Sequence, residues 1–183
     1  MVLLAKPLRP IALAQSGERL NIYEMTGKTP PTKQLATSIR AARPSDIGDI
    51  LRIARAAYAK YVSRIGREPA PMTADYAADI AARRVVLMEA GGALCGYMVA
   101  WPEGDAYFIE NIGIEPRYQG MGLGRRLFAH AVSQAKSIGL AALSLYTNEA
   151  MTENLSMYAH IGFAETHRLS EYGFRRVYMR WTF

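Results

Sequence analysis

The chain has 183 residues, of which 50% are hydrophobic and 21% charged, a composition typical of one soluble globular domain. Its single cysteine, Cys95, excludes a disulfide within the chain, and no apolar run approaches the roughly 18 residues of a membrane-spanning helix. We therefore expect a cytoplasmic protein without a membrane partner.

The formal net charge of +6 is concentrated near the start of the chain. Residues 1–43 hold seven Lys and Arg against two Asp and Glu, whereas residues 44–183 hold fifteen against fourteen. The expected folded body is thus close to neutral, which argues against nucleic acid as a partner.

Residues 1–37 contain four prolines, scattered basic residues and no sustained hydrophobic periodicity. We interpret them as an N-terminal extension without a core of its own, in part disordered. Short apolar runs at 2–4 and 11–13 leave open that the extension docks on the domain or on a second subunit. The domain itself is expected to cover residues 38–183.

Hydrophobic periodicity and turn signals predict the elements of this domain. In chain order they are a strand over 38–42, helices over 45–62 and 73–83, strands over 85–90, 93–101 and 106–114, a helix over 120–138, a strand over 141–147, a helix over 152–160, and strands over 163–169 and 174–181. The order β-α-α-β-β-β-α-β-α-β-β predicts a single α/β domain with a mixed twisted sheet of about six to seven strands and about four helices. The helix between the fourth and fifth strands predicts a parallel crossover in the middle of an otherwise antiparallel sheet.

A glycine-rich segment joins the fourth strand to the helix after it. Residues 119–124 read Gln-Gly-Met-Gly-Leu-Gly, and glycines in alternate positions let the backbone approach a ligand closely. The following helix directs free N–H groups and the positive end of its dipole at this turn. The segment therefore predicts an anion site, for which phosphate is the usual occupant.

Two common phosphate-binding motifs do not fit this segment. A dinucleotide-binding βαβ unit uses Gly-x-Gly-x-x-Gly and an acid at the end of the next strand. Here the spacing is Gly-x-Gly-x-Gly, and the next strand reads Ala-Leu-Ser-Leu-Tyr-Thr. A Walker loop needs Gly-Lys-Ser/Thr, which is absent.

The segment resembles instead the Arg/Gln-x-x-Gly-x-Gly/Ala turn of the GNAT family of N-acetyltransferases. Three further runs resemble that family in order. Residues 110–116 resemble its fourth strand, 154–163 its second cofactor motif, which ends in Tyr-x-x-x-Gly-Phe/Tyr, and 173–179 its final strand. The resemblance covers the chain from about Ser38 to the end, roughly four-fifths of it.

The resemblance implies an acyltransferase that moves an acetyl group from acetyl-CoA, as acyl-donor substrate, directly to a primary amine of a small molecule or peptide. The pyrophosphate is then expected on the backbone of residues 119–124, and the pantetheine arm between strands that splay apart at 112–114 and 143–146. The positions implied to bind acetyl-CoA are Ile112, Gly113, Ile114, Gln119, Gly120, Met121, Gly122, Leu123, Gly124, Arg125, Asn154 and Tyr158. The alternative class is an acyl-CoA-binding regulatory or interaction module with the same fold and little or no catalysis.

Tyr158 matches the position of the family's general acid, five residues before Phe163. A phenol of pKa about 10 that protonates a thiolate near 8.5 works uphill by roughly 2 kcal/mol. Either the site lowers the pKa of Tyr158, or its hydroxyl mainly donates a hydrogen bond to the leaving sulfur.

Glu110 is the candidate general base, because an amine with pKa about 10.4 is only about 0.1% unprotonated near neutral pH. On a regular strand Glu110 shares a face with Phe108, Ile112 and Ile114, an unusual place for a carboxylate unless that face borders a cleft. The family often uses a glutamate in this strand, frequently through a water. An ion pair with a nearby arginine is the alternative.

The second motif departs from the family pattern at Met151, where many relatives carry an asparagine seven residues before the tyrosine. Asn148 and Asn154 flank this position, and we favour Asn154 as a partner of the pantetheine amides. The three histidines have no metal-ligand spacing, so no metal is expected. By the resemblance, the first two helices and the last hairpin form the acceptor site, whose amine the sequence does not name. A homodimer that covers an exposed sheet edge is the default expectation.

Overall fold

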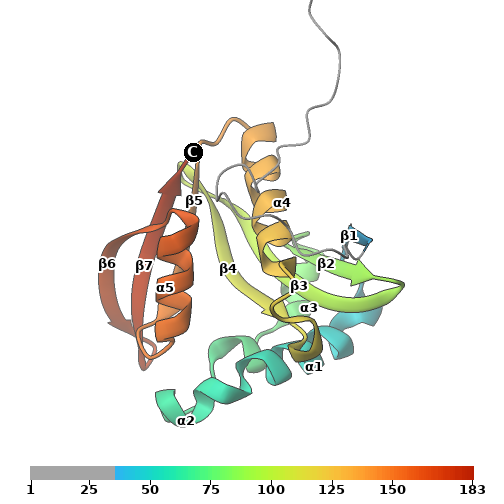
Figure 1. Cartoon of the computed structure of the whole chain (residues 1–183), viewed down its shortest axis with the longest axis horizontal. Coiled ribbons are helices and arrows are strands. Elements are labelled where there is room, and N and C mark those ends of the chain that lie inside the picture. The colour runs from blue at the N-terminus through green and yellow to red at the C-terminus, as the bar shows by residue number, and fades with distance from the viewer. Residues whose placement is uncertain (1–35) are drawn as a thin grey trace, which may run out of the picture. The chain divides into compact units, whose positions relative to one another are not determined.

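The computed structural model describes residues 36–183, so residues 1–35 of the predicted extension lie outside the described residues. The described part is one α/β unit with a twisted sheet between two layers of helices (Figure 1). Its strands are β1 (Thr37–Ala41), β2 (Val85–Ala90), β3 (Ala93–Glu103), β4 (Ala106–Ile114), β5 (Ala142–Asn148), β6 (Ala164–Glu171) and β7 (Phe174–Thr182). Its helices are α1 (Ile47–Tyr58), α2 (Val62–Ile65), α3 (Tyr76–Ala81), α4 (Leu123–Ser137) and α5 (Thr152–Ile161). This order confirms the predicted fold class.

The predicted first helix is divided into two pieces. A tight 3-10 turn at Ala59–Tyr61 separates α1 from α2, and Gly66 ends α2 with a left-handed φ of 79°. We call this stretch, residues 47–65, the helical arm. The second predicted helix is shorter than expected, because Asp75 caps α3 by accepting hydrogen bonds from the N–H groups of Ala77 and Ala78.

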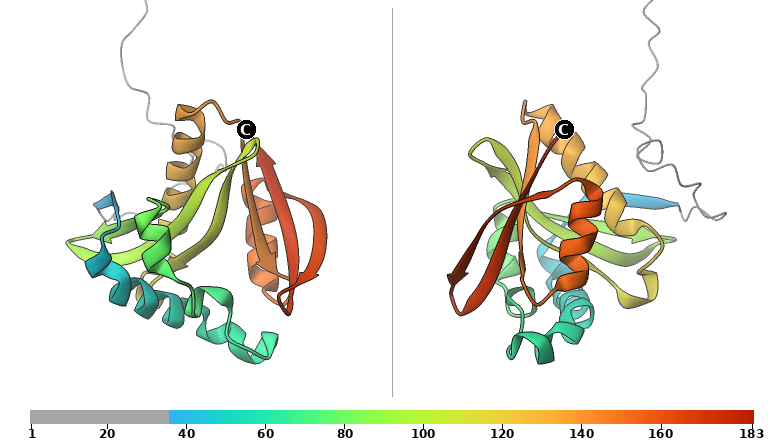
Figure 2. Two further views of the ribbon diagram at one scale, coloured as in Figure 1. Left: turned by 180° about the vertical axis from the view of Figure 1, so that it is seen from behind. Right: turned by 60° about the vertical axis from the view of Figure 1, so that its left-hand side comes forward.

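The strands lie in the order β1-β2-β3-β4-β5-β7-β6. The β4–β5 pair is parallel and the other pairs are antiparallel, as the crossover through α4 predicted. α4 and α5 cover one face, while α1 and α3 cover the β2–β4 part of the other (Figure 2). Apolar stripes explain this packing: Leu127, Ala131 and Ala135 of α4 are fully buried against one face, and Ile50 and Ile53 of α1 against the other.

The sheet opens in its middle. β4 and β5 are paired only from Tyr107 opposite Leu143 to Ile109 opposite Leu145. Beyond that point β4 stays with β3 up to Ile114, and β5 stays with β7 up to Asn148. The gap between the two central strands therefore opens at their C-terminal ends. From these ends the chain continues toward α4 and α5.

A β-bulge stands at the point of divergence. Ala100 of β3 pairs with Ile109 and Val99 pairs with Asn111, so Glu110 has no partner on β3. The extra residue reverses the alternation beyond it. Phe108 and Asn111 lie on the α1–α3 side of the sheet, while Ile112 and Ile114 pack against the α4 core. Glu110 shares a face with Phe108, as predicted, but the prediction that Ile112 and Ile114 lie on that face is wrong.

Among residues 36–183, no helix is both long and apolar enough to cross a bilayer.

Candidate functional site

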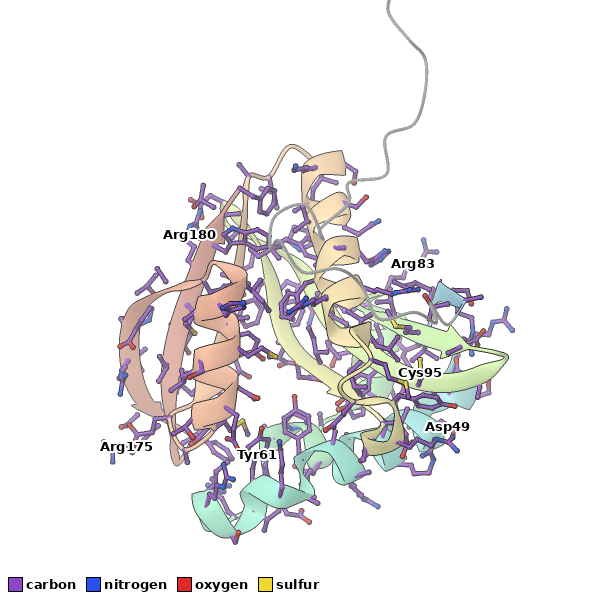
Figure 3. All side chains as sticks on the ribbon, in the orientation of Figure 1. Asp49, Tyr61, Arg83, Cys95, Arg175 and Arg180 are labelled. Atoms are coloured by element: carbon purple, nitrogen blue, oxygen red, sulfur yellow. The ribbon has the colours of Figure 1, made fainter. Side chains whose placement is uncertain are left out.

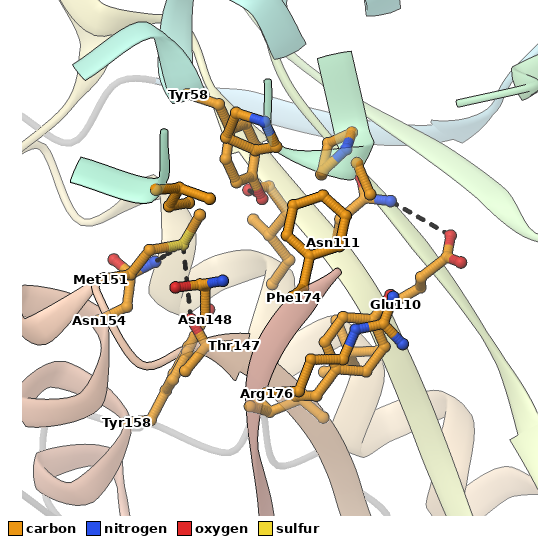
Figure 4. Close-up of a pocket in the computed structure, with 18 residues that line it drawn as sticks. Tyr58, Glu110, Asn111, Thr147, Asn148, Met151, Asn154, Tyr158, Phe174 and Arg176 are labelled. Carbon is orange, nitrogen blue, oxygen red and sulfur yellow. Dashed lines mark hydrogen bonds between the residues drawn. The ribbon is translucent and has the colours of Figure 1, made fainter. Parts of the chain in front are cut away.

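A cleft lies where β4 and β5 diverge (Figure 4). Its walls are residues 109–112 of β4, 145–148 of β5, 174 and 176 of β7, positions 151, 154 and 158 before and along α5, and positions 58 and 65 of the helical arm with loop 69–71. Of the predicted site residues, Glu110, Ile112, Asn154 and Tyr158 all line it. Segments distant in the sequence thus meet at one place, with both predicted catalytic residues among them.

Glu110 is half-buried in this cleft and carries no ion pair among the described residues, so the salt-bridge alternative is not observed. Its carboxylate accepts one hydrogen bond, from Asn111 Nδ2 to Oε2 at 3.3 Å. Burial raises the pKa of Glu110 above its ordinary value, and the negative charge of Asp79 adds to this. Arg176, Arg84 and the hydrogen bond from Asn111 oppose the rise. A carboxylate with a raised pKa is suited to accept a proton near neutral pH.

Asn111 is the unexpected neighbour of this carboxylate. The bulge places Glu110 and Asn111 on the same side of the sheet, although they are consecutive. Asn111 is 6% exposed, and its Oδ1 is a buried side-chain oxygen that accepts no hydrogen bond within residues 36–183. Turning the amide over would place this oxygen against the Glu110 carboxylate. The orphaned oxygen costs about 1–3 kcal/mol, which the fold tolerates at this point.

Tyr158 projects from α5 into the cleft. Its ring packs edge-on against Phe128 and Phe163, at centroid distances of 6.0 and 5.9 Å. Its hydroxyl makes no hydrogen bond with the described residues, and burial raises the pKa of Tyr158. The direction of this shift contradicts a lowered pKa, and it favours the role of hydrogen-bond donor to the leaving sulfur.

The helical arm is tied to both walls of the cleft. The Tyr58 hydroxyl donates to the carbonyl of Ile112 on β4 at 3.0 Å. The Tyr61 hydroxyl, which lies between the arm and α5 in Figure 3, donates to Asn154 Oδ1 at 3.1 Å. Arg64 and Glu153 form an exposed ion pair at 2.7 Å beside it. The arm therefore forms one side of the cleft, and its role in an acceptor site stays a prediction.

Asn154 has protein partners for both polar atoms of its side chain. Besides the bond from Tyr61, its Nδ2 donates to Met151 Sδ at 3.5 Å, and Thr147 Oγ1 lies 3.6 Å from the same sulfur. Met151, which stands where the family resemblance implied asparagine, is buried and serves as a weak acceptor inside the fold. Each of these atoms has capacity for one more hydrogen bond, so Asn154 can contact a ligand while Tyr61 holds it.

The glycine loop, residues 119–125, lies outside the cleft lining, at the start of α4. Gly120 and Gly122 both have φ of 77°, a left-handed conformation that favours glycine. The first hydrogen bond of α4 runs from the N–H of Arg126 to the carbonyl of Gly122, so the three N–H groups before it have no partner within the helix. Gln119 Nε2 donates to the carbonyl of Ile114 at 3.0 Å and fixes the loop to β4.

Gly113 has a structural reason to be glycine. A Cβ at this position would lie 2.2 Å from the Tyr97 ring, which crosses it from the paired strand. The Tyr76 hydroxyl donates to the carbonyl of Pro71 at 2.8 Å, so the Tyr97 hydroxyl is the donor to Tyr76, also at 2.8 Å. This buried chain fixes loop 69–71 at the edge of the cleft.

Sequence reasoning missed Asn111 and Arg176 among the residues that line the cleft, and it placed Tyr146 in a splayed strand without naming it as a site residue. Arg175 and Arg176 are adjacent on β7, so strand alternation sends one to each face of the sheet. The sequence did not say which of the two faces the cleft, and the bulge that brings in Asn111 has no signature in residue type.

Comparison with known proteins identifies the family. The model of the "Acetyltransferase (GNAT) family" matches residues 49–163. The match covers more than half of the chain and includes β4, the glycine loop and α5. The protein belongs to the GNAT family.

Individual relatives match over shorter stretches. The chain is 37% identical over 62 residues to the mycothiol acetyltransferase of Streptosporangium roseum, covering 34% of this chain and 18% of that protein. It is 33% identical over 61 residues to the [ribosomal protein bS18]-alanine N-acetyltransferase of Escherichia coli K12, covering 33% and 41%. The chain thus spans well under two thirds of the length of these curated relatives.

Solved structures share the fold along most of the chain. The PaiA N-acetyltransferase of Thermoplasma acidophilum, in complex with coenzyme A, superposes with a TM-score of 0.70 at 14% identity. The superposition covers 81% of this chain and 100% of that one. At this identity the likeness establishes the fold.

Proposed function

We propose that the protein is an acetyl-CoA-dependent N-acetyltransferase that moves an acetyl group directly to a primary amine of a small molecule or peptide. One observation carries this proposal: Glu110 and Tyr158 line the same cleft, at the point where the two central strands diverge. Membership of the GNAT family supports the same reading. A module that only binds acyl-CoA needs neither an unpaired carboxylate nor an unbonded tyrosine hydroxyl there.

The donor is proposed to lie between the glycine loop and the cleft. Its pyrophosphate would bind the free N–H groups at the start of α4, where the helix dipole and Arg125 favour negative charge. Its pantetheine arm would follow the edge of β4 that β5 leaves. On that edge the carbonyls of Ile112 and Ile114 are already taken by Tyr58 and Gln119. The N–H groups of these two residues are therefore the proposed donors to the pantetheine and thioester oxygens.

The reaction then needs one proton acceptor and one group that stabilises sulfur. Glu110 takes a proton from the acceptor ammonium, directly or through a water, and frees the nitrogen lone pair. The nitrogen attacks the thioester carbonyl, the C–N bond forms, and the C–S bond breaks with its electron pair on sulfur. The Tyr158 hydroxyl donates a hydrogen bond to this thiolate. The attacking nitrogen loses its second proton as the amide forms, and the thiolate takes up one proton and leaves as the thiol. A raised pKa keeps the Tyr158 hydroxyl protonated for this task.

Release of free thiol from acetyl-CoA over a panel of primary amines tests the proposal. We expect amine-dependent release that falls in both Glu110→Gln and Tyr158→Phe. Tight binding of acetyl-CoA without release for any amine would favour the acyl-CoA-binding module instead.

A further inference from the structure

Two side chains of opposite charge face the cleft from different strands. Glu110 directly follows Ile109, the last β4 residue that pairs with β5. Arg176 of β7 lies opposite Asn148, three residues beyond the last β5 residue in that pairing. Both side chains therefore stand past the point where the sheet opens, and both line the cleft (Figure 4).

The Arg176 guanidinium is held in place by its neighbours. Its central carbon lies 4.0 Å from the centre of the Tyr146 ring, and its Nη1 donates to Glu171 Oε1 at 2.8 Å. The Tyr178 hydroxyl donates to the same Glu171 oxygen. The Arg176 side chain is only 14% exposed. An arginine fixed in this way loses little further entropy on binding, and its remaining N–H groups suit the planar fork of a carboxylate.

Glu110 and Arg176 do not neutralise each other by contact. Within residues 36–183 the hydrogen-bond partner of Glu110 is Asn111, and no ion pair includes Glu110. Burial raises the pKa of Glu110, and the charge of Arg176 acts from further away to oppose that rise. A negative carboxylate and a positive guanidinium that face one cleft without touching favour a ligand that carries both charges.

We propose that the acceptor is a small amine that carries its own carboxylate, as an amino acid does; this inference rests on the acetyltransferase function proposed above. The acceptor carboxylate binds the free N–H groups of Arg176, and its amine lies toward Glu110. The Tyr146 ring and Glu171 hold the guanidinium in position for this contact. A plain amine, or the amino terminus of a long peptide, offers no carboxylate beside its amine and leaves the Arg176 N–H groups that do not bond Glu171 without a ligand acceptor.

Matched substrate pairs test the proposal. Each pair is a free amino acid and its carboxamide, which have the same amine and side chain, and kcat/KM is measured for both by thiol release. We expect the wild type to favour the carboxylate member by about 10- to 100-fold, the value of a charge-assisted hydrogen bond. Arg176→Gln is expected to bring the ratio close to one, mainly through KM. Arg176→Lys keeps the charge but loses the fork, so an intermediate ratio is expected.

Arg175→Gln is the matched control. Arg175 is the preceding residue on β7, its side chain is 73% exposed, and it pairs with Glu149 at the outer end of the β6–β7 hairpin (Figure 3). Its substitution removes the same charge from the same strand on the other face. The preference for the carboxylate member is expected to stay at the wild-type value, and thermal melting of the three variants reports whether the hairpin stays folded.

The outcomes separate this inference from the function beneath it. If carboxamides or plain amines are acetylated by the wild type as well as the free acids, the acceptor class is wrong and the acetyltransferase function stands. If Arg176→Gln keeps the wild-type ratio, Arg176 is not the anchor. If no amine is acetylated, calorimetric binding of the same pairs to the protein with coenzyme A decides. A carboxylate preference lost in Arg176→Gln supports the recognition site alone, and no preference overturns it.

Discussion

The glycine loop and the cleft are built in opposite ways. The loop is one continuous stretch between β4 and α4, and it offers backbone N–H groups at the start of a helix. The cleft is assembled from side chains of β4, β5, α5, β7 and the helical arm. A site made of backbone tolerates most side-chain changes but is sensitive to an added Cβ where a ligand approaches. A site made of side chains loses its chemistry with the change of one atom.

The electrostatics of the two regions differ in the same way. The loop lies at the positive end of the α4 dipole and includes Arg125, which suits a pyrophosphate of fixed charge. The cleft holds a carboxylate, Glu110, which has no ion pair among residues 36–183, and a guanidinium, Arg176, which Glu171 holds in place from a neighbouring strand. We infer that the loop serves the donor and the cleft serves the acceptor and the chemistry. Substitutions in the two regions should therefore separate donor affinity from turnover.

The largest effect is expected from Glu110→Gln, which keeps the size of the side chain and removes the base. Turnover should fall by about 10²- to 10⁴-fold, with little change in affinity for acetyl-CoA. The wild-type rate should fall as the pH is lowered and Glu110 takes up a proton. Because burial raises the pKa of Glu110, this fall should begin at a higher pH than it would for an ordinary carboxylate. The loss should be greatest between the pKa of Glu110 and that of the amine, and the carboxylate limb should vanish in the variant.

Initial rates of thiol release from pH 5 to 9 measure this profile. Glu103→Gln, at the exposed end of β3, is the control and should match the wild type. If the rate of Glu110→Gln falls at low pH as the wild-type rate does, that fall belongs to the titration of another group, and Glu110 is not the base.

Tyr158→Phe should have the next largest effect. The hydroxyl has no hydrogen-bond partner among the described residues, while the ring packs on Phe128 and Phe163. Phenylalanine keeps that packing, so the melting temperature should stay at the wild-type value. Turnover should fall by about 10- to 100-fold, the value of a hydrogen bond to a developing thiolate. Rates and melting curves measured together check this, and a full rate would remove Tyr158 from the reaction.

A smaller effect, confined to the donor, is expected from Gly124→Ala. In the protein alone a Cβ at Gly124 meets no atom within 4 Å, and the residue lies in the first turn of α4. Alanine should therefore stabilise the fold by about 0.5–1 kcal/mol. If the pyrophosphate approaches this backbone, affinity for acetyl-CoA should nevertheless fall on the order of tenfold, since one charge-assisted hydrogen bond is displaced.

Gly48→Ala in α1 is the matched control for this prediction. A Cβ there also meets no atom within 4 Å, and Gly48 is far from the loop in the sequence. The control should raise the melting temperature without changing the affinity for acetyl-CoA, both measured by calorimetry. Equal affinities in the two variants would place the pyrophosphate elsewhere.

Most of the fold could be predicted because its signals are local. The stripe at Leu127, Ala131 and Ala135 marks α4, and Gly91-Gly92, both with positive φ, form the turn between β2 and β3. The crossover rule then gives the one parallel pair of the sheet. The tight turn at Ala59–Tyr61 was missed because the apolar spacing of the helical arm continues through it.

The site was only partly predictable, because much of it depends on contacts between segments that are distant in the sequence. The glycine loop could be located because a backbone site is continuous in the sequence. Glu110 and Tyr158 were found through family motifs, and their roles stay predictions. Asn111 could not be found, because one extra residue in a strand changes which neighbours share a face without changing their types. Arg176 could not be chosen over Arg175, because that depends on how β7 is oriented against β5.

The smallest effect, and the most informative about Asn111, is expected from Asn111→Leu. The substitution removes the hydrogen bond that lowers the pKa of Glu110, so the pKa of this base should rise further and the acid limb of the rate profile should move to higher pH. Turnover at high pH should stay near the wild-type value. Stability should not fall, because the orphaned buried Oδ1, which costs about 1–3 kcal/mol, is removed together with one weak hydrogen bond.

Asn111→Asp completes this test, because it should raise the pKa of Glu110 as well but lower the stability. A second carboxylate beside Glu110 also raises the pKa of Glu110, through charge repulsion, but it buries another ionisable group. The acid limb should therefore move to higher pH in both variants, while the melting temperature falls only in Asn111→Asp. If the limb stays in place in both, Glu110 is not tuned by its neighbour on the bulge. The pairing of two consecutive side chains on one face would then be a matter of packing alone.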